Sequence, residues 1–165
     1  MTSQPTTRQI WDEIDKANFG VLGMVTAGGE SRTVGIVYVV DSHKIYIGAQ
    51  PAQWKIRHIK RNPHVSLTVA IPRRVPLLPW IKVPATTITF SGTARVLGPD
   101  DLDAELLRKL YRHEEGRDNW CAIEMTPEKD FITYGVGVSV LEMRHPEKSR
   151  GRAPVTAGQA GNRSV

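Results

Sequence analysis

The chain has 165 residues, of which 40% are hydrophobic, and this fits one globular domain with its own core. No apolar run approaches the roughly 20 residues of a membrane-spanning helix, and residues Met1 to Ile14 lack the order of a signal peptide. We therefore expect a cytoplasmic protein without a membrane span. A single cysteine, Cys121, excludes an internal disulfide framework, and the histidines have no ligand spacing, so no metal site is predicted.

The net charge is +5, and the basic residues gather in two places, Lys55 to Arg61 and Glu147 to Arg163. Such basic patches can bind nucleic acid, but the sequence contains no recognisable helix-turn-helix, zinc-finger or aromatic RNA-binding motif. A small anionic ligand explains the first patch with fewer assumptions. The second patch lies in a tail, residues 149–165, that has too little apolar content to fold alone. We expect one domain over residues 1–148 and a tail that is poorly ordered or contacts a partner chain.

The first half of the chain predicts a helix, a hairpin and a further strand. Apolar residues fall on one face of the helix, which Thr6 or Thr7 would cap. Gly28 and Gly29 supply the backbone freedom that the hairpin turn requires. The predicted elements are a helix Arg8 to Ala17, strands Phe19 to Thr26 and Arg32 to Val40, and a strand Lys44 to Ala49.

The second half predicts mainly strands. Four prolines between Pro72 and Pro84 exclude a helix or a central strand there. The predicted elements are strands His64 to Ile71 and Ala85 to Leu97, a helix from Asp100 or Asp101 to about Glu115, and strands Asn119 to Met125 and Phe131 to Val138 across the turn TPEKD. Six or seven strands joined by short turns and few helices predict an antiparallel barrel.

The segment from Lys44 to Val69 carries the strongest functional signal. It predicts a strand, a short basic helix that Pro51 starts and Pro63 stops, and a second strand. A helix N-terminus has unpaired N–H groups and partial positive charge, so this point, with Lys55 beside it, attracts phosphate or another anion. From spacing alone, a solvated basic helix between two strands is an equal interpretation.

The order of these elements resembles the pyridoxamine 5'-phosphate oxidase-like split barrels, a family that binds FMN or a deazaflavin. Lys55, Asn62, Pro63 and Val65 match the family pattern. The chain departs from it at five positions: Ser31 and Gly35 stand where prolines are usual, Ala49 for threonine, Gln53 for serine and His64 for arginine. Two hydroxyls that would help to hold a phosphate are therefore absent, and Gln53, Gln50 and backbone amides would have to compensate.

The resemblance implies a homodimer with a cofactor in each cleft between the subunits. The phosphate would lie on Lys55 and the helix start, with Ala49 beside it, and Trp54 would either cover a ring edge or simply pack against the barrel wall. The flavin ring would lie along the backbone of Arg32, Thr33, Val34 and Gly35, where Gly35 permits a close approach. The apolar loop with Leu78 and Trp80 needs cover, and we leave two interpretations open: a lid that sets substrate choice, or a plug in the dimer interface.

The resulting prediction is a six- to seven-stranded antiparallel split β-barrel of the FMN-binding type. Its function would be that of an oxidoreductase using FMN, or alternatively a deazaflavin, on a small apolar substrate. A non-catalytic flavin- or haem-binding protein of the same fold is the alternative. No catalytic residue can be named, because a flavin itself carries the hydride. The substrate-phosphate residues of pyridoxamine phosphate oxidase itself are not matched.

Overall fold

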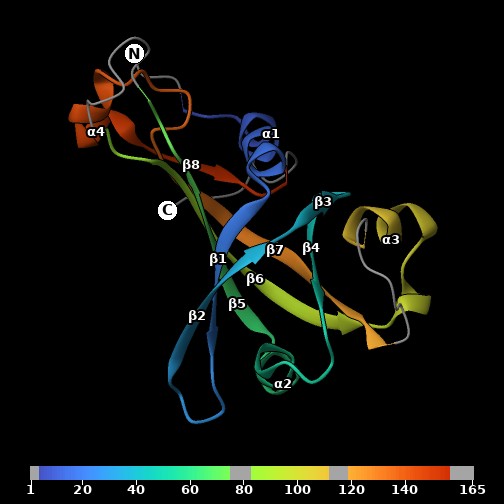
Figure 1. Cartoon of the computed structure of the whole chain (residues 1–165). Helices are drawn as coiled ribbons and strands as arrows, with labels where there is room; N and C mark the ends of the chain where they lie inside the picture. The colour runs from blue at the N-terminus through green and yellow to red at the C-terminus, as the bar shows by residue number, and fades with distance from the viewer. Residues whose placement is uncertain (1–3, 75–82, 112–118, 157–165) are drawn as a thin grey trace.

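The computed structural model describes residues 4–74, 83–111 and 119–156. They form a mainly β fold in which one antiparallel sheet curls into a half-barrel, with the strand order β2-β1-β5-β6-β7-β4-β3 and β8 paired to β7 (Figure 1). The predicted split-barrel class is confirmed. The strands are β1 Phe19–Val25, β2 Ser31–Val37, β3 Val39–Asp41, β4 Lys44–Ala49, β5 His64–Ile71, β6 Thr86–Leu97, β7 Cys121–Tyr134 and β8 Arg150–Pro154.

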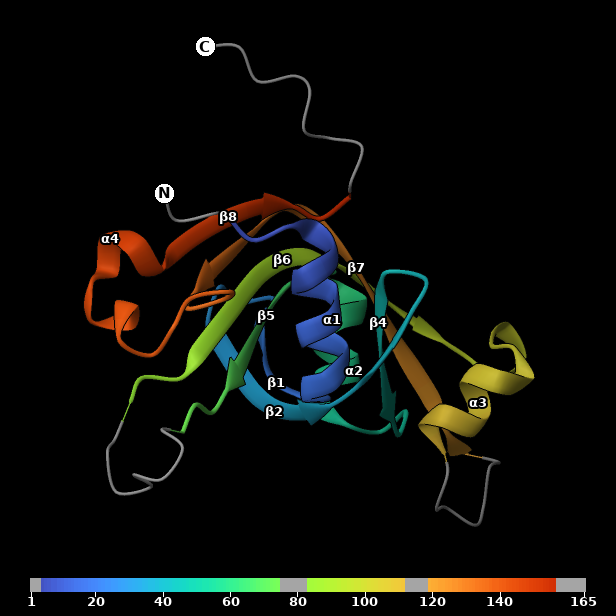
Figure 2. The same cartoon turned by 90° about the horizontal axis from the view of Figure 1, so that it is seen from above.

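Helix α1, Thr7–Ala17, lies on the concave side of the curled sheet (Figure 2). Thr6 caps it as predicted, and the Gln9 side chain accepts a hydrogen bond from the Thr6 N–H in return, 2.9 Å away. Ile10 and Ile14 are fully buried and belong to the main core cluster with the inward residues of the strands. The apolar stripe of α1 therefore fills the barrel.

Helix α2, Trp54–Arg61, joins β4 to β5, as predicted for the basic segment. It begins after Gln53 rather than directly after Pro51, because a turn closed by the Gln53 N–H and the Gln50 carbonyl comes first. Ile56 and Ile59 are 1% and 2% exposed and belong to the main core cluster. The helix thus has an apolar face toward the core and leaves its basic residues outside.

The predicted pair of strands after residue 119 is wrong. Residues Cys121–Tyr134 form one strand, β7, because the supposed turn TPEKD stays in the sheet opposite β6. The β6–β7 pairing is irregular at this point: the register shifts between Thr89 and Ser91, and Lys129 has a positive φ of 64°. At Gly92, a Cβ would lie only 2.2 Å from the Thr126 carbonyl oxygen, so glycine permits the close strand approach here.

The helix after β6 is shorter than predicted. A 3-10 turn, η1 Pro99–Asp101, comes first, and α3 spans Ala104–Leu110. Asp103, rather than Asp100 or Asp101, caps it, since its carboxylate accepts the Leu106 N–H at 2.8 Å. Residues 112–118, which include the expected end at Glu115, lie outside the described residues. Leu106 of α3 and Leu102, just before the helix, are buried with Tyr46 in a second core cluster.

Part of the segment that we expected to be a poorly ordered tail is instead a strand, β8, paired with β7. After two short helices, η3 Glu142–Arg144 and α4 Pro146–Ser149, strand β8 pairs with Asp130–Tyr134 of β7. Val155 is 5% exposed, and its carbonyl accepts the indole N–H of Trp11 at 3.1 Å. These residues are held by partners far away in the sequence, which the composition of the tail does not reveal. Among the described residues, no helix is long and apolar enough to cross a membrane.

Candidate functional site

The junction of β4 and α2 presents an open helix start. Ala49, the last residue of β4, is 1% exposed, and the chain then turns through Gln50 to Gln53. Gln53 is the N-cap residue of α2, but its side chain makes no capping hydrogen bond. No side-chain cap takes up the N–H groups of the first turn. The Ile56 N–H donates to the Gln53 carbonyl at 3.0 Å, so those of Trp54 and Lys55 can serve an anionic acceptor.

Lys55 stands in this first turn and is only half-buried. Its pKa is lowered, chiefly because burial disfavours the charged ammonium, while the nearby Cys121 thiol acts in the opposite direction. No described carboxylate forms an ion pair with Lys55. A partly desolvated cation without a counter-charge gains more from a bound anion than a fully hydrated lysine does.

The Gln53 side chain gives a second sign of an incomplete site. Its Oε1 atom is buried and has no hydrogen-bond partner among the described residues. A buried acceptor left unpaired costs about 1–3 kcal/mol. A hydroxyl of a bound ligand, or rotation of the amide so that its NH2 group meets a ligand oxygen, would recover this cost. Gln53 therefore suits the role that the absent serine would have.

Strand β2 presents the predicted ring-binding residues at one end of the sheet. Because β2 is terminal in the strand order, one of its backbone edges has no neighbouring strand among the described residues. Thr33 and Gly35 point to the outer face and are exposed, whereas Val34 packs partly against the core. Arg32 is exposed and pairs with Glu30 at 2.8 Å, so its charge is already compensated. The Phe19 ring already covers the outer face at Gly35, where an added Cβ would lie 3.1 Å from its Cζ atom, so a planar ring would have to contact the backbone edge of β2 instead.

An open groove of about 350 Å³ lies on the β1–β2–β5 part of the sheet. Register pairs Gly23 of β1 with Thr33 of β2 and with Ser66 of β5, so small side chains line the floor. Of the predicted residues, Arg32 and Thr33 belong to it; the others are Gly23, Met24, Val25, Ser31, His64, Val65 and Ser66. The sequence analysis did not identify this second group. The small residues at alternate positions of β1 and β5, such as Gly23 and Ser66, could have indicated an open outer face there.

Three predicted residues remain to be considered: Trp54, Leu78 and Trp80. Trp54 is 38% exposed and packs edge-on against His58 within α2, with ring centroids 5.6 Å apart. Leu78 and Trp80 lie outside the described residues, so neither the lid nor the plug interpretation is tested. Among the described residues, no group of histidines, cysteines or carboxylates is suited to a metal ion.

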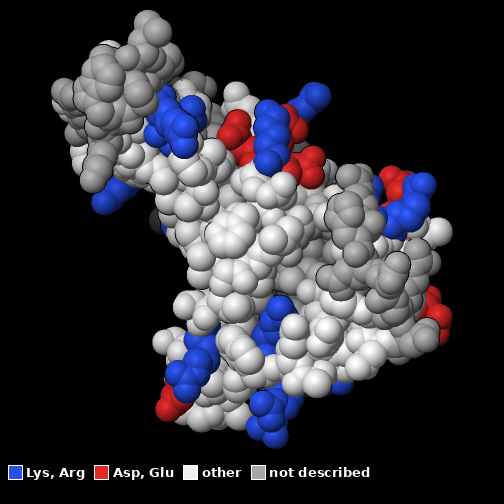
Figure 3. Space-filling model, in the orientation of Figure 1, with Lys and Arg blue, Asp and Glu red and all other residues white. Residues whose placement is uncertain are grey.

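Over β1, β2 and β5 the outer face of the sheet has no lysine, arginine, aspartate or glutamate among its outward residues, whereas over β4, β6 and β7 it carries Lys44, Arg95, Glu124 and Glu128. Phe19, Val21 and Val37 are 51%, 41% and 69% exposed on the uncharged part, and Ile132 of β7 is 53% exposed. Figure 3 shows a broad uncharged area over β1 and β2. Other outward residues in this region are small or hydroxyl-bearing, and they include Thr33, Gly35, Ser66, Thr68, Thr89 and Ser91. An exposed apolar face of this extent marks an interaction surface.

Comparison with known proteins gives the family. The sequence profile described as Pyridoxamine 5'-phosphate oxidase matches residues 6–132. No curated protein matches. A Listeria innocua structure provisionally named pyridoxamine 5'-phosphate oxidase is 16% identical, with a TM-score of 0.60, and covers 74% of this chain and 94% of its own. General Stress Protein 26 of Bacillus anthracis is 17% identical, with a TM-score of 0.55, and covers 81% and 95%.

The haem storage protein HutZ of Vibrio cholerae has the same fold, with 16% identity, a TM-score of 0.58 and coverage of 78% and 94%. At these identities the structures establish the fold, while the profile covers more than half of the chain. The chain therefore belongs to the pyridoxamine 5'-phosphate oxidase family.

Proposed function

We propose that the protein is a flavin-dependent oxidoreductase that binds FMN in a cleft between two copies of the chain and acts on a small apolar substrate. The observation that carries this proposal is the start of α2. There a helix N-terminus without a side-chain cap and a half-buried Lys55, which has no ion pair with any described carboxylate, meet at the end of β4. This combination suits a terminal phosphate, which needs donors and positive charge together.

Each predicted residue has a role in this proposal. Lys55 and the α2 amides bind the phosphate, and Gln53 and Gln50 replace the missing hydroxyls. The unpaired edge of β2 from Thr33 to Gly35 orients the ring. When bound, the flavin supplies hydride or electron transfer, and the protein supplies binding and orientation. A deazaflavin with the same phosphate attachment is the alternative cofactor.

The uncharged part of the outer face, over β1, β2 and β5, supports the dimer. Large apolar side chains such as Val37 and Ile132 are costly in water, and a second copy related by a two-fold axis covers both copies of this face at once. The groove at Thr33 and Ser66 opens on the same face. A partner subunit would therefore close it from the other side and exclude water from the ring.

A non-catalytic carrier is the second candidate. Two proteins of similar fold, HutZ and a Mycobacterium smegmatis protein with a TM-score of 0.58, are named for haem storage and haem binding. Among the described residues, only His64 of the histidines lines the groove, and it would be the first axial ligand to test.

The absorption spectrum of freshly purified protein, followed by titration with FMN, deazaflavin and haem, tests the proposal. We expect flavin bands, or saturable FMN binding, and loss of these bands on reduction with a nicotinamide coenzyme. A Soret band, together with failure to bind either flavin, would contradict the flavin-dependent enzyme and favour the haem carrier.

A further inference from the structure

A small pocket lies where the two ends of the described chain meet. Its volume is about 70 Å³, and its walls are residues 147–151, the N-terminal residues Gln4 and Pro5, and Val136 and Val138 just after β7. Figure 1 shows α4 and β8 at the end of the molecule away from α2. This pocket, which we call the terminal pocket, is therefore separate from the β4–α2 junction and from the groove on β1, β2 and β5.

The volume of the terminal pocket limits its ligand. A single water needs about 10–15 Å³ of such space, and pockets for drug-sized ligands begin at about 300 Å³. At about 70 Å³ the terminal pocket lies between these limits. It therefore has room for a small ion, but not for a flavin ring.

The walls of the terminal pocket are held in place by hydrogen bonds and close packing. Gln4 Oε1 accepts a backbone N–H of β8 at 3.1 Å. Pro5 packs so closely on β8 that a Cβ at Gly151 would lie 2.8 Å from its Cδ atom. On the other side, Ser149 is 2% exposed, and its hydroxyl donates to the His145 carbonyl at 3.0 Å. The pocket is therefore formed without a ligand.

Cations prevail among the ionisable side chains that line the terminal pocket. Lys148 and Arg150 are two cations against one carboxylate, Glu147, so the lining carries one net positive charge. Glu147 lies 3.6 Å from His145 Nδ1, and no described carboxylate forms an ion pair with Lys148 or Arg150. Arg152, two residues further along β8, is outside the lining and pairs with an aspartate of β7 at 3.7 Å.

The chemistry of these two side chains specifies the ligand class. Lysine and arginine side chains have only donors, so they need an acceptor, and their charge favours an anionic one. A guanidinium can bind two oxygens of a phosphate or carboxylate at once, which makes such charge-assisted hydrogen bonds strong. Water would satisfy the donors but would not compensate the charge.

We propose that the terminal pocket binds a small oxyanion, inorganic phosphate or a short carboxylate, through Lys148 and Arg150. The second basic patch of the sequence, Glu147 to Arg163, begins in this lining, and the proposal gives that part of it a ligand. A bound anion would lie between α4, β8 and the N-terminal segment. The proposal uses no residue of the β4–α2 junction and is independent of the proposed function.

Anion titrations followed by NMR test this proposal. The Lys55→Ala variant is used throughout, so that phosphate at α2 does not contribute, and sodium chloride of equal ionic strength is the reference. We expect saturable shifts of the Gly151 amide signal and its neighbours with phosphate or acetate, and the anion that binds more tightly identifies the class. Lys148→Gln and Arg150→Gln should each weaken binding about two- to fivefold, the effect of an exposed ion pair.

The matched control is Arg152→Gln, which removes the same charge from the same strand outside the lining and should leave the anion affinity unchanged. Equal losses in Arg150→Gln and Arg152→Gln would overturn the proposal, as would amide shifts that chloride reproduces at equal ionic strength.

The proposed function and the terminal pocket fail separately. If phosphate binds the wild type but not Lys55→Ala, the anion site is at α2 alone, which refutes the terminal pocket and supports the proposed function. If Gly151 responds to phosphate in a protein that binds no flavin, the terminal pocket stands and the proposed function falls.

Discussion

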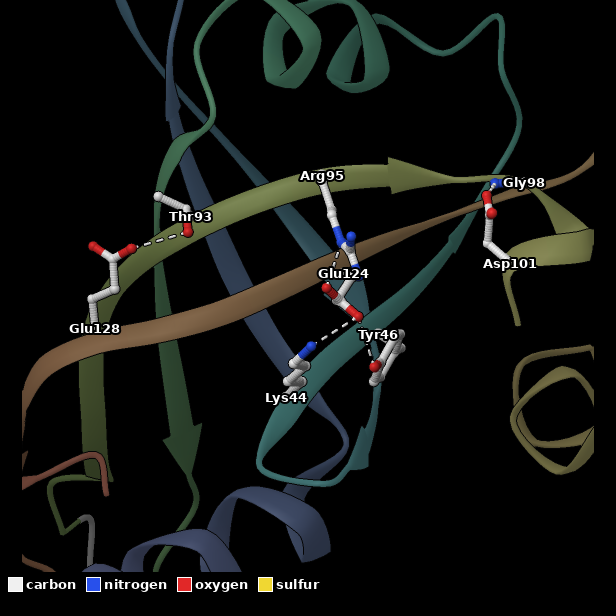
Figure 4. A network of polar contacts seen from close by, with 8 residues as sticks. All are labelled: Lys44, Tyr46, Thr93, Arg95, Gly98, Asp101, Glu124 and Glu128. Atoms are coloured by element: carbon white, nitrogen blue, oxygen red, sulfur yellow. Dashed lines mark hydrogen bonds and ion pairs between the residues drawn. The ribbon is translucent and has the colours of Figure 1, made fainter. Parts of the chain in front are cut away.

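The Tyr46 hydroxyl donates a 2.9 Å hydrogen bond to the Glu124 carboxylate, where the two residues are direct partners across the β4–β7 ladder (Figure 4). The other carboxylate oxygen, Oε1, accepts the Arg95 Nε–H at 2.7 Å, and Lys44 Nζ lies 3.3 Å from Oε2, the oxygen that accepts from Tyr46. Burial alone would raise the pKa of Glu124, but the hydrogen bonds from Arg95, Tyr46 and Lys44 outweigh it and lower this pKa. One buried carboxylate thus joins three strands, β4, β6 and β7.

This network predicts a pH-dependent stability. Because the pKa of Glu124 is lower in the folded state than its ordinary 4.5, the carboxylate stabilises the fold above pH 4.5, and this contribution is lost as pH falls through the lower folded value. Glu124→Gln should reduce the free energy of unfolding in urea by about 1–3 kcal/mol at pH 7. The variant should also lose less stability than the wild type on acidification.

The matched control is Glu128→Gln, which changes a carboxylate on the same strand that accepts from Thr93 at the surface, 3.0 Å away. Its effect should stay within about 0.5 kcal/mol. If both variants changed the free energy of unfolding equally, the buried network around Glu124 would contribute no more to stability than the surface hydrogen bond of Glu128.

Lys55→Ala should weaken FMN binding by about one to two decades, since a charge-assisted contact contributes about 1.5–3 kcal/mol. Isothermal titration at neutral pH measures this directly. Lys16→Ala, at an exposed lysine in the last turn of α1, serves as the control, and its affinity should equal that of the wild type. Unchanged affinity in Lys55→Ala would show that the phosphate lies elsewhere.

FMN affinity should also depend on pH through Lys55. Because burial lowers the pKa of this ammonium from 10.5, its charge, and with it the affinity, should be lost as pH rises through that lowered value. Lys55→Arg keeps its charge, so its affinity should stay level over the same alkaline range. If the FMN affinities of the wild type and Lys55→Arg fell in parallel with rising pH, a group other than Lys55 would be responsible for the loss.

A charge on the outer face should split the dimer. Val37→Glu and Ile132→Glu each place a carboxylate on an exposed apolar position of the sheet, where a partner subunit would bury it at a high cost. Sedimentation at micromolar concentration should show a dimer for the wild type and monomers for both variants. Leu141→Glu, at a 73% exposed position outside the strands, is the control and should remain dimeric. A monomeric wild type would remove the shared-cleft arrangement.

Trp11→Phe should test the attachment of the C-terminal segment. The change leaves the buried Val155 carbonyl without its indole donor, which should cost about 1–2 kcal/mol in a thermal or urea unfolding experiment. Tyr38→Phe removes a comparable hydrogen bond, 2.7 Å from the Tyr38 hydroxyl to the Ile14 carbonyl, without touching β8. Backbone amide exchange over Arg150–Pro154 should increase in the first variant and not in the second.

The sequence by itself determined the elements whose signals are local. The Thr6 cap and the apolar stripe of α1, the glycines of the first hairpin, and the basic helix between two strands all act within a few residues of one another. Periodicity and capping are properties of such short stretches, so they can be read without knowing the rest of the fold. The same holds for Lys55 at the helix start.

Only the tertiary structure decided where distant segments meet. The TPEKD segment reads locally as a turn, yet its pairing with β6 keeps it in β7, and β8 exists because β7 and Trp11 bind it. Likewise, Cys121 lies opposite Ala49, and Ser66 and Thr33 lie on either side of Gly23, through strand register alone. Register depends on which strands pair and at which offset, and a shift of one residue would turn every side chain to the other face. No local pattern carries that information.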